Sequence, residues 1–190
     1  MAYKIRSVGL SNVRRDLSNL RQEVRETIRR LDSTTLELNL GIKIIVKDVD
    51  TSDLKALEQR VIKEVKKAHS AAVRSVRNNL EKALDQAMEN PVWAWISGSR
   101  DIIDTGQLRD SRKVIIDSDN DIHIIYNEEY AAIVHYGGYV NAFGDPGRTY
   151  YYPGRPWVTA LLEGNGPVEK FPFELLYQEA FTDYLRKIKL

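Results

Sequence analysis

The side chains that most often do chemistry are few in this chain, and their spacing fits no catalytic or metal site. The three histidines are His69, His123 and His135, and no two of them stand at the spacing of metal ligands. The chain has no cysteine, which excludes disulfides and thiolate metal sites. It also lacks the glycine motifs of nucleophile elbows, phosphate loops and dinucleotide-binding turns. We therefore predict a non-enzymatic protein with no metal and no cofactor.

The acidic pairs indicate solvated turns rather than a catalytic dyad. Glu128 and Glu129 are adjacent at an expected helix start, where acids favour the helix dipole. A glycosidase needs two carboxylates across a cleft, and nothing in the sequence selects such a pair. His123 stands between apolar residues of an expected strand, and we expect its side chain to face outward.

Two basic helical patterns have the kind of face that contacts phosphate groups, one over residues 10–31 and one over residues 54–87. Acidic residues interleave both patterns, and the sequence has no helix-turn-helix or zinc signature. These faces are compatible with contact to double-stranded DNA without sequence specificity, and equally with solvated helix surfaces. The residues expected to face DNA are Arg14, Arg21, Arg25, Lys63 and Lys67, with Lys66, Arg74 and Arg77 adding to the second pattern.

The densest aromatic group lies in and beside a loop that glycines and prolines punctuate, residues 137–154. Its members are Tyr136, Tyr139, Phe143, Tyr150, Tyr151, Tyr152 and Trp157. These rings either cap the core or form a contact between protein subunits, where Tyr and Trp are favoured. We favour the subunit contact, made by an extended loop or hairpin arm.

The elements that must position these residues can be read from periodicity. Strict alternation of apolar residues over 36–46 predicts a strand, or a hairpin bent near Gly41. A helix-start cluster at 50–53 and Pro91 enclose a helix of about 37 residues, or about 55 Å. Residues 10–31 predict an earlier amphipathic helix.

The second half of the chain predicts shorter elements. Strands at 114–116 and 122–125 form a hairpin, and residues 128–136 form a short helix that Gly137 ends. Pro156 begins a helix within 155–163, and residues 171–190 form the last helix. The fold class is α+β: a small antiparallel sheet flanked by helices, with one long helix and an extended aromatic arm.

Composition places the chain among ordinary globular proteins, with 43% hydrophobic and 29% charged residues. No apolar run approaches the length of a membrane span, and the basic N-terminus lacks the apolar segment of a secretory signal. The net charge is +1, with basic residues in excess over residues 1–100 and acidic residues in excess over 101–190. Such a chain either meets a copy of itself head to tail or carries solvated faces without a partner.

Three short motifs follow one another between residues 104 and 158. Asp104 to Ser111 has the pattern D-T-G-x-L-x-x-S, Tyr130-Ala131 precedes Gly137, and Arg155-Pro156-Trp157 precedes the next helix. In this order, with a hairpin between the first two, they resemble the tail-completion and neck proteins of long-tailed bacteriophages. The resemblance covers about residues 90–190, whereas residues 1–50 are an N-terminal elaboration and 51–90 the long helix of a single domain spanning residues 1–190.

The motif residues have local structural roles as well. Thr105 and Gly106 supply a tight turn, Leu108 fills the core, and Tyr130 and Ala131 lay a short helix on the sheet. We expect Arg155 to pair with an acid near the turn, such as Asp104. The motif and interface residues predicted in this way are Asp104, Thr105, Gly106, Leu108, Tyr130, Ala131, Gly137, Tyr150, Tyr151, Tyr152, Arg155, Pro156 and Trp157.

The resemblance implies a structural virion protein that is assembled in the host cytoplasm. Such proteins form a homo-oligomeric ring, usually sixfold, that terminates the tail or joins it to the head while DNA passes through the lumen. The implied partners are further copies of the chain, the adjacent neck or connector proteins, and tail tube or sheath proteins, with no membrane. There are two alternatives. One is a stopper or adaptor position in the same neck, and the other is a nucleic-acid-binding accessory protein that uses the basic helices.

Overall fold

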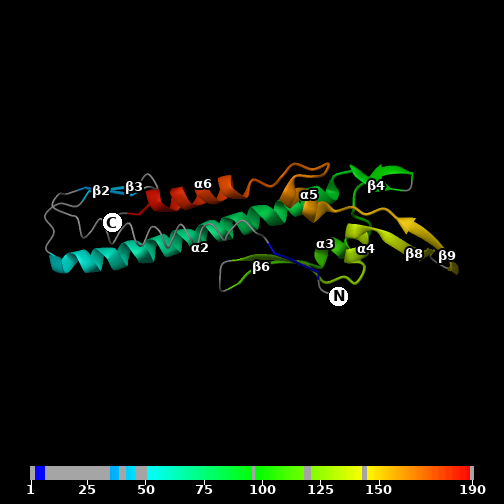
Figure 1. Cartoon of the computed structure of the whole chain (residues 1–190), viewed down its shortest axis with the longest axis horizontal. Coiled ribbons are helices and arrows are strands. Elements are labelled where there is room, and N and C mark those ends of the chain that lie inside the picture. The colour runs from blue at the N-terminus through cyan, green and yellow to red at the C-terminus, as the bar shows by residue number, and fades with distance from the viewer. Residues whose placement is uncertain are drawn as a thin grey trace. The chain divides into compact units, whose positions relative to one another are not determined.

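A computed structural model describes residues 3–6, 35–38, 42–45, 51–95, 97–117, 121–142 and 145–188. The fold is α+β, with one long helix and small antiparallel sheets, as the sequence predicts (Figure 1). The strands are β1 (Tyr3–Arg6), β2 (Thr35–Leu38), β3 (Ile42–Ile45), β4 (Trp93–Trp95), β5 (Gly98–Arg100), β6 (Arg112–Ile116), β7 (Ile122–Tyr126), β8 (Gly138–Ala142) and β9 (Asp145–Tyr152). The helices are α2 (Thr51–Glu89), α3 (Gln107–Asp110), α4 (Ala131–Tyr136), α5 (Trp157–Glu163) and α6 (Phe173–Arg186).

Packing divides the chain into two compact units. Unit 1 consists of Met1–Ser7 and Val73–Tyr177, and unit 2 of Val8–Ala72 and Gln178–Leu190. Helix α2 begins in unit 2 and ends in unit 1, and α6 begins in unit 1 and ends in unit 2. That residues 1–190 form a single domain stays a prediction.

The long helix α2 confirms the predicted helix between residues 50 and 91. It has 39 residues, about 58 Å at 1.5 Å per residue. The helix ends at Glu89, shortly before Pro91, because the residue before a proline avoids helical backbone angles. The buried residues recur every three or four positions, the spacing of one helical face. They include Val61, Val65, Ala68, Ala72, Val76, Leu80, Leu84 and Met88.

A three-stranded antiparallel sheet in unit 1 has the strand order β1-β7-β6. The β6–β7 hairpin confirms the predicted hairpin, with Val114 opposite Ile124. The sequence pattern did not predict β1, which pairs Tyr3 with Tyr126 and Arg6 with His123. Because β7 is the central strand, it has a hydrogen-bonded neighbour on each side.

The end of α2 is bound both to the strand that follows it and to a later strand of unit 1. The Trp93 indole donates a 2.6 Å hydrogen bond to the Ala87 carbonyl at the end of α2. The Arg112 guanidinium in β6 binds both carboxylate oxygens of Asp85 in α2, at 2.6 and 3.1 Å. The last turns of α2 therefore bind both β4 and β6 within unit 1.

The first elements are only partly within the described residues. Strands β2 and β3 pair as an antiparallel hairpin, with Leu36 opposite Ile44. Of the two predicted alternatives for residues 36–46, the hairpin is therefore the one that the structure shows. Residues 39–41, which include the predicted bend, lie outside the described residues. The predicted helix over residues 10–31 lies outside them as well.

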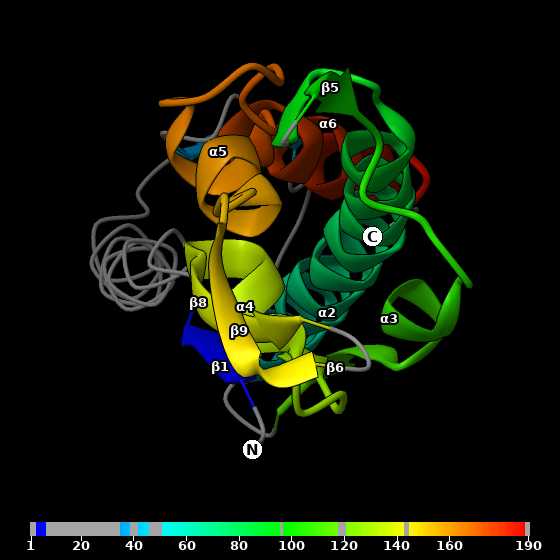
Figure 2. The same ribbon diagram turned by 90° about the vertical axis from the view of Figure 1, so that its right-hand side faces the viewer.

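The hairpin of β8 and β9 confirms the predicted aromatic arm over residues 137–154. It extends from α4 at one end of unit 1 (Figure 1). Viewed toward that end, the hairpin stands in front of α4, with α5 beside it (Figure 2). The predicted short helix is α4, which begins three residues later than expected, and α5 follows Pro156.

Candidate functional site

The β8–β9 hairpin presents an exposed group of aromatic rings. Tyr139 lies opposite Tyr151 in the strand register, and their rings meet edge to face with centroids 5.5 Å apart. Tyr139 is 77% exposed and Tyr151 is 58% exposed, and a cross-strand aromatic pair of this kind stabilises the hairpin. Tyr136 and Tyr150 are also exposed. We call these four residues, Tyr136, Tyr139, Tyr150 and Tyr151, the tyrosine cluster.

Two glycines allow two backbone segments to approach closely at the base of this hairpin. Gly137 has φ +76° at the end of α4, a conformation that other L-residues rarely adopt. A Cβ on Gly137 would lie 2.5 Å from the Gly154 nitrogen, and one on Gly154 would lie 2.5 Å from the Tyr136 carbonyl carbon. The two ends of the arm thus touch backbone to backbone, and neither position has room for a side chain.

Arg155 anchors the same crossing from within the protein. Its backbone N–H donates to the Val134 carbonyl at 2.9 Å, and its Nη1 donates to the Asp101 carbonyl at 3.0 Å. Its guanidinium carbon lies 5.0 Å from the Trp95 ring and 5.1 Å from the Tyr152 ring. Trp95 and Tyr152 in turn meet edge to face at 5.4 Å. The cation is therefore held by ring faces and a backbone carbonyl.

The predicted ion pair of Arg155 with Asp104 is wrong. Asp104 lies 3.9 Å from Arg100, which also approaches Asp101 at 3.6 Å, and no described carboxylate lies within 4.0 Å of the Arg155 guanidinium. Burial, and then the charge of Arg100, lower the pKa of Arg155, while Asp101 and Asp104 act against this from further away. The Arg155 side chain is only 3% exposed, so the short carboxylate side chains on the surface do not reach it.

Trp157 belongs to the core and not to the exposed interface that its aromatic character predicts. It is 1% exposed, and its indole N–H donates to the Tyr126 hydroxyl at 2.9 Å. That hydroxyl donates to the Met88 sulfur at 3.8 Å, and burial raises the pKa of the Tyr126 phenol. Its Pro156 neighbour is exposed at the start of α5. The motif Arg155-Pro156-Trp157 therefore fixes the end of the arm to the core.

The Asp104 turn is built as predicted. Gly106 has φ +83° and starts the single turn α3, where Leu108 is buried and Asp104 and Thr105 are exposed. The Ser111 hydroxyl donates to the Leu108 carbonyl at 2.8 Å and closes the turn. The Asp104 turn thus packs against the rest of unit 1 through the Leu108 side chain.

Tyr130 and Ala131 start α4 with opposite exposures. Ala131 is buried, whereas the Tyr130 side chain is 39% exposed. Burial, and then the carboxylates of Glu128 and Asp104, raise the pKa of the Tyr130 phenol. These two carboxylates come from the turn before α4 and the turn before α3.

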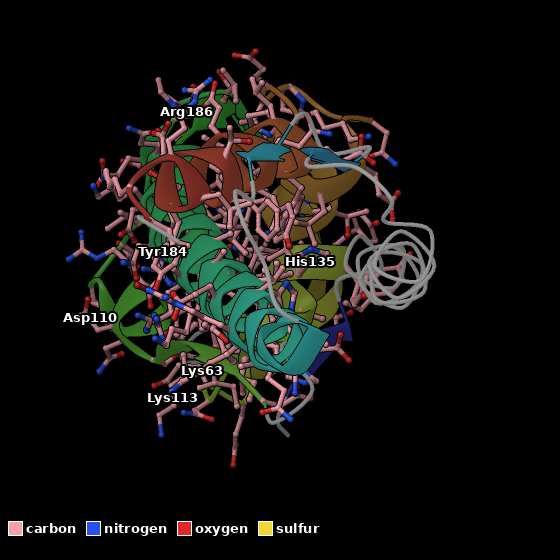
Figure 3. The ribbon with its side chains drawn as sticks, turned by 90° about the vertical axis from the view of Figure 1, so that its left-hand side faces the viewer. Lys63, Asp110, Lys113, His135, Tyr184 and Arg186 are labelled. Carbon is pink, nitrogen blue, oxygen red and sulfur yellow. The ribbon has the colours of Figure 1, made fainter. Side chains whose placement is uncertain are left out.

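The three histidines belong to three different elements, His69 to α2, His123 to β7 and His135 to α4. The prediction that His123 faces outward is wrong, because it is buried and its Nε2 lies 2.9 Å from Asp117. His135 is buried between the rings of Tyr136 and Trp157, and burial lowers its pKa to about 4 (Figure 3). Among the described residues, no group of three or more His, Cys, Asp and Glu side chains could hold a metal ion.

The basic residues of α2 have different surroundings. Lys63 is exposed on the outer side of the helix (Figure 3), and Lys66 and Arg74 are exposed as well. Lys67 is exposed but binds Glu64 at 2.7 Å. Arg77 is not free to bind phosphate, because it donates to the Val114 carbonyl at 2.9 Å and binds Glu81 at 2.7 Å. Arg14, Arg21 and Arg25 lie outside the described residues.

Sequence reasoning missed the stacking of Arg155 between Trp95 and Tyr152. The spacing of Trp93 and Trp95 predicts one shared face, and the structure agrees, since Trp93 is buried, Ala94 between them is exposed, and Trp95 is half-buried beside the arm. The position of Arg155 between a glycine and a proline was the only local feature that singled it out. Its aromatic partner comes from a distant segment, which no local pattern identifies.

No protein-family model, no curated protein and no solved structure matches this chain. Of the described helices, none is long and apolar enough to cross a membrane.

Proposed function

We propose that this chain is a non-enzymatic structural subunit of the neck or tail of a long-tailed bacteriophage. It assembles with further copies into a ring, through which DNA passes without being read. The observation that carries the proposal is the tyrosine cluster, displayed on a hairpin whose base is fixed by Gly137, Gly154 and Arg155. The partners beyond the ring are the adjacent connector and the tail tube or sheath.

The physical argument begins with the hairpin itself. A two-stranded hairpin is marginally stable alone, and it gains stability when another surface covers one of its faces. Tyrosine suits such a contact because its ring is large and its hydroxyl tolerates both water and burial. Tyrosine is enriched among the few interface residues whose truncation costs about 2 kcal/mol or more in binding. The exposed rings of Tyr139 and Tyr151 are therefore suited to a subunit contact.

The three motifs support the same proposal through their structural roles. The end of α4 and the start of α5 flank and anchor the arm, and the Asp104 turn adds a buried Leu108 to the core of the same unit. Motifs that fix the geometry of the β8–β9 hairpin suit a protein that acts by assembling with its neighbours. A stopper or adaptor position within the same neck would use the same surfaces.

The exposed lysines of α2 favour the second candidate, a nucleic-acid-binding accessory protein. Lys63 and Lys66 are exposed and lie close together along the helix. Such a protein would bind DNA as a monomer, with an affinity that falls steeply as salt rises. This behaviour separates it from a ring that encloses DNA.

The test is the oligomeric state of the full chain, measured by size exclusion with light scattering and by electron microscopy. We expect rings for the unmodified chain, and loss of at least tenfold in assembly affinity for the double variant Tyr139→Ser/Tyr151→Ser. The matched control is Leu175→Ser, which removes an exposed apolar side chain outside the hairpin and should leave assembly unchanged. A monomer with salt-sensitive DNA affinity would contradict the proposal and support the second candidate.

A further inference from the structure

The β8–β9 hairpin is attached to the rest of unit 1 through glycines. Its two ends touch backbone to backbone at Gly137 and Gly154, and Gly138 follows with φ +151°. Among the described strands, β8 and β9 pair only with each other, so neither continues the three-stranded sheet. A close contact at one point allows rotation about that point, and glycines restrict such rotation little. The base of the hairpin therefore does not by itself fix the direction of the arm.

The neighbouring β4–β5 hairpin, in contrast, is fixed to the end of α2. Both hairpins lie at the same end of unit 1 (Figure 1). Ahead of β5, the Trp93 indole donates to the Ala87 carbonyl at 2.6 Å. Behind it, the Ile102 N–H donates to the Met88 carbonyl at 2.8 Å. Trp93 and Ile102 are both buried. The β4–β5 hairpin is therefore a fixed point to which the arm can be tied.

Tyr152, the last residue of β9, is where the two hairpins meet. Its ring lies edge to face with the Trp95 ring of β4 at 5.4 Å. The Arg155 guanidinium carbon lies 5.1 Å from the Tyr152 ring and 5.0 Å from the Trp95 ring, within the range of cation–π attraction. Its Nη1 donates to the Asp101 carbonyl, just beyond β5, at 3.0 Å. One cation therefore contacts the end of the arm and the segment that holds β4 and β5.

The surroundings of Arg155 favour a role in orientation over a role in stability alone. Its side chain is 3% exposed, and its Nε has no hydrogen-bond partner among the described residues. A buried cation without a paired carboxylate is costly, and a well-packed apolar side chain of similar volume is often at least as stabilising. Buried charges that persist at such a cost can specify one conformation among several.

We propose that Arg155 is a latch that fixes the direction of the β8–β9 hairpin by tying Tyr152 to Trp95. Without the latch, the hairpin turns about its glycine base while the rest of unit 1 stays folded. The latch is a property of a single copy of the chain. Its consequence for assembly rests on the proposed function: a hairpin held in one direction loses less conformational entropy when a neighbouring copy binds the tyrosine cluster.

Distances between introduced spin labels, measured by pulsed electron paramagnetic resonance, report the direction of the hairpin. The chain has no cysteine of its own, so the labels attach only where cysteines are introduced. The arm pair, Gln86→Cys with Thr149→Cys, joins α2 to β9, and the mount pair, Gln86→Cys with Ser99→Cys, joins α2 to β5. All three positions are exposed. Excess unlabelled chain confines each distance to one copy, whether or not copies assemble.

Arg155→Met keeps a long buried side chain but removes the cation. We expect the distance distribution of the arm pair to broaden at least twofold, and that of the mount pair to stay unchanged. Arg155→Lys should broaden the arm pair as well, because an ammonium lacks the planar face that stacks on rings. The matched control is Arg100→Met. The Arg100 guanidinium carbon lies 5.1 Å from the same Trp95 ring, but Arg100 belongs to β5 and the arm pair should stay narrow.

A second variant, Trp95→Leu, leaves Arg155 in place, removes the other half of the latch and should also broaden the arm pair. Narrow arm-pair distances in both Arg155→Met and Trp95→Leu would overturn the latch while leaving the proposed ring. Broadening of both pairs together would overturn it too, because Arg155 would then hold the whole unit together. A broadened arm pair in a chain that never forms rings would support the latch and overturn the proposed function.

Discussion

At the scale of single residues, Gly137 and Gly154 determine how the arm leaves unit 1. Both lie where two backbone segments approach too closely for a Cβ, but only Gly137 also has a positive φ. Gly98 is the converse case, with φ +134° and no atom within 4 Å of the place that a Cβ would take. The three glycines therefore separate the effect of space from the effect of backbone conformation.

Alanine substitutions should follow that separation. We expect Gly98→Ala to cost about 1–2 kcal/mol from backbone strain alone, and Gly154→Ala about 1–3 kcal/mol from crowding alone. Gly137→Ala combines both effects and should be the most destabilising. Urea unfolding of the full chain measures the three costs. Equal costs at Gly98 and Gly137 would show that the crossing adds nothing to the backbone strain.

His135 links stability to pH. Burial lowers its pKa from 6.5 to about 4 in the folded chain, so the unfolded chain takes up the proton more readily. The stability contribution is therefore present above pH 6.5 and is lost as the pH falls toward 4. Between about pH 7.5 and about pH 5 this loss is about 2 kcal/mol.

The matched variant is His135→Phe, which keeps a buried ring but cannot titrate. Urea unfolding at both pH values should show a pH-dependent loss about 2 kcal/mol smaller for the variant than for the unmodified chain. Carboxylates titrate in both proteins and cancel in this difference. An identical pH dependence in the two proteins would mean that His135 accepts its proton as easily folded as unfolded.

At the scale of the elements, the C-terminal half of α2 holds the edge strand β6. Asp85 binds Arg112 with two hydrogen bonds, and Arg77 donates to the Val114 carbonyl of the same strand. These contacts cover the edge with charged side chains, which also discourages pairing with strands of other molecules. The helix therefore supports unit 1 by polar contacts as well as by its buried face.

Substitution of Asp85 tests the strength of that support. Asp85→Asn weakens a two-point contact to a guanidinium that is 11% exposed, and we expect a loss of about 1–3 kcal/mol in unfolding free energy. The comparison on the same helix is Lys67→Ala, which breaks an exposed pair with Glu64 and should cost much less than Asp85→Asn. Equal effects in a denaturant titration would show that Asp85 contributes no more than a surface ion pair.

At the scale of the whole molecule, the distribution of charge bears on assembly more than the net charge of +1 does. Basic residues are in excess over residues 1–100, and acidic residues are in excess over residues 101–190. Opposite charges on two parts of the chain favour the association of one copy with the next. Because ions screen such pairs, the assembly should weaken as salt rises from about 0.05 to about 0.5 M, where the Debye length falls from about 14 Å to about 4 Å.

Local patterns in the sequence predicted the elements whose conformation depends mainly on neighbouring residues. The limits of α2 follow from its start cluster and Pro91, and the β6–β7 hairpin follows from two apolar runs around a polar turn. The arm over residues 137–154 was likewise predictable, since glycines and tyrosines recur there with little helical character. In each case the conformation depends on contacts within a few residues.

Contacts between distant segments decided the rest. His123 is buried in β7, where Arg6 of the distant strand β1 pairs with it, and the alternation within β7 does not identify that partner. Arg155 stacks on Trp95, and Trp157 binds Tyr126, across long stretches of chain. Alternation and residue type indicate which side chains can be buried, but the free energy of burial depends on which partners the fold brings to them.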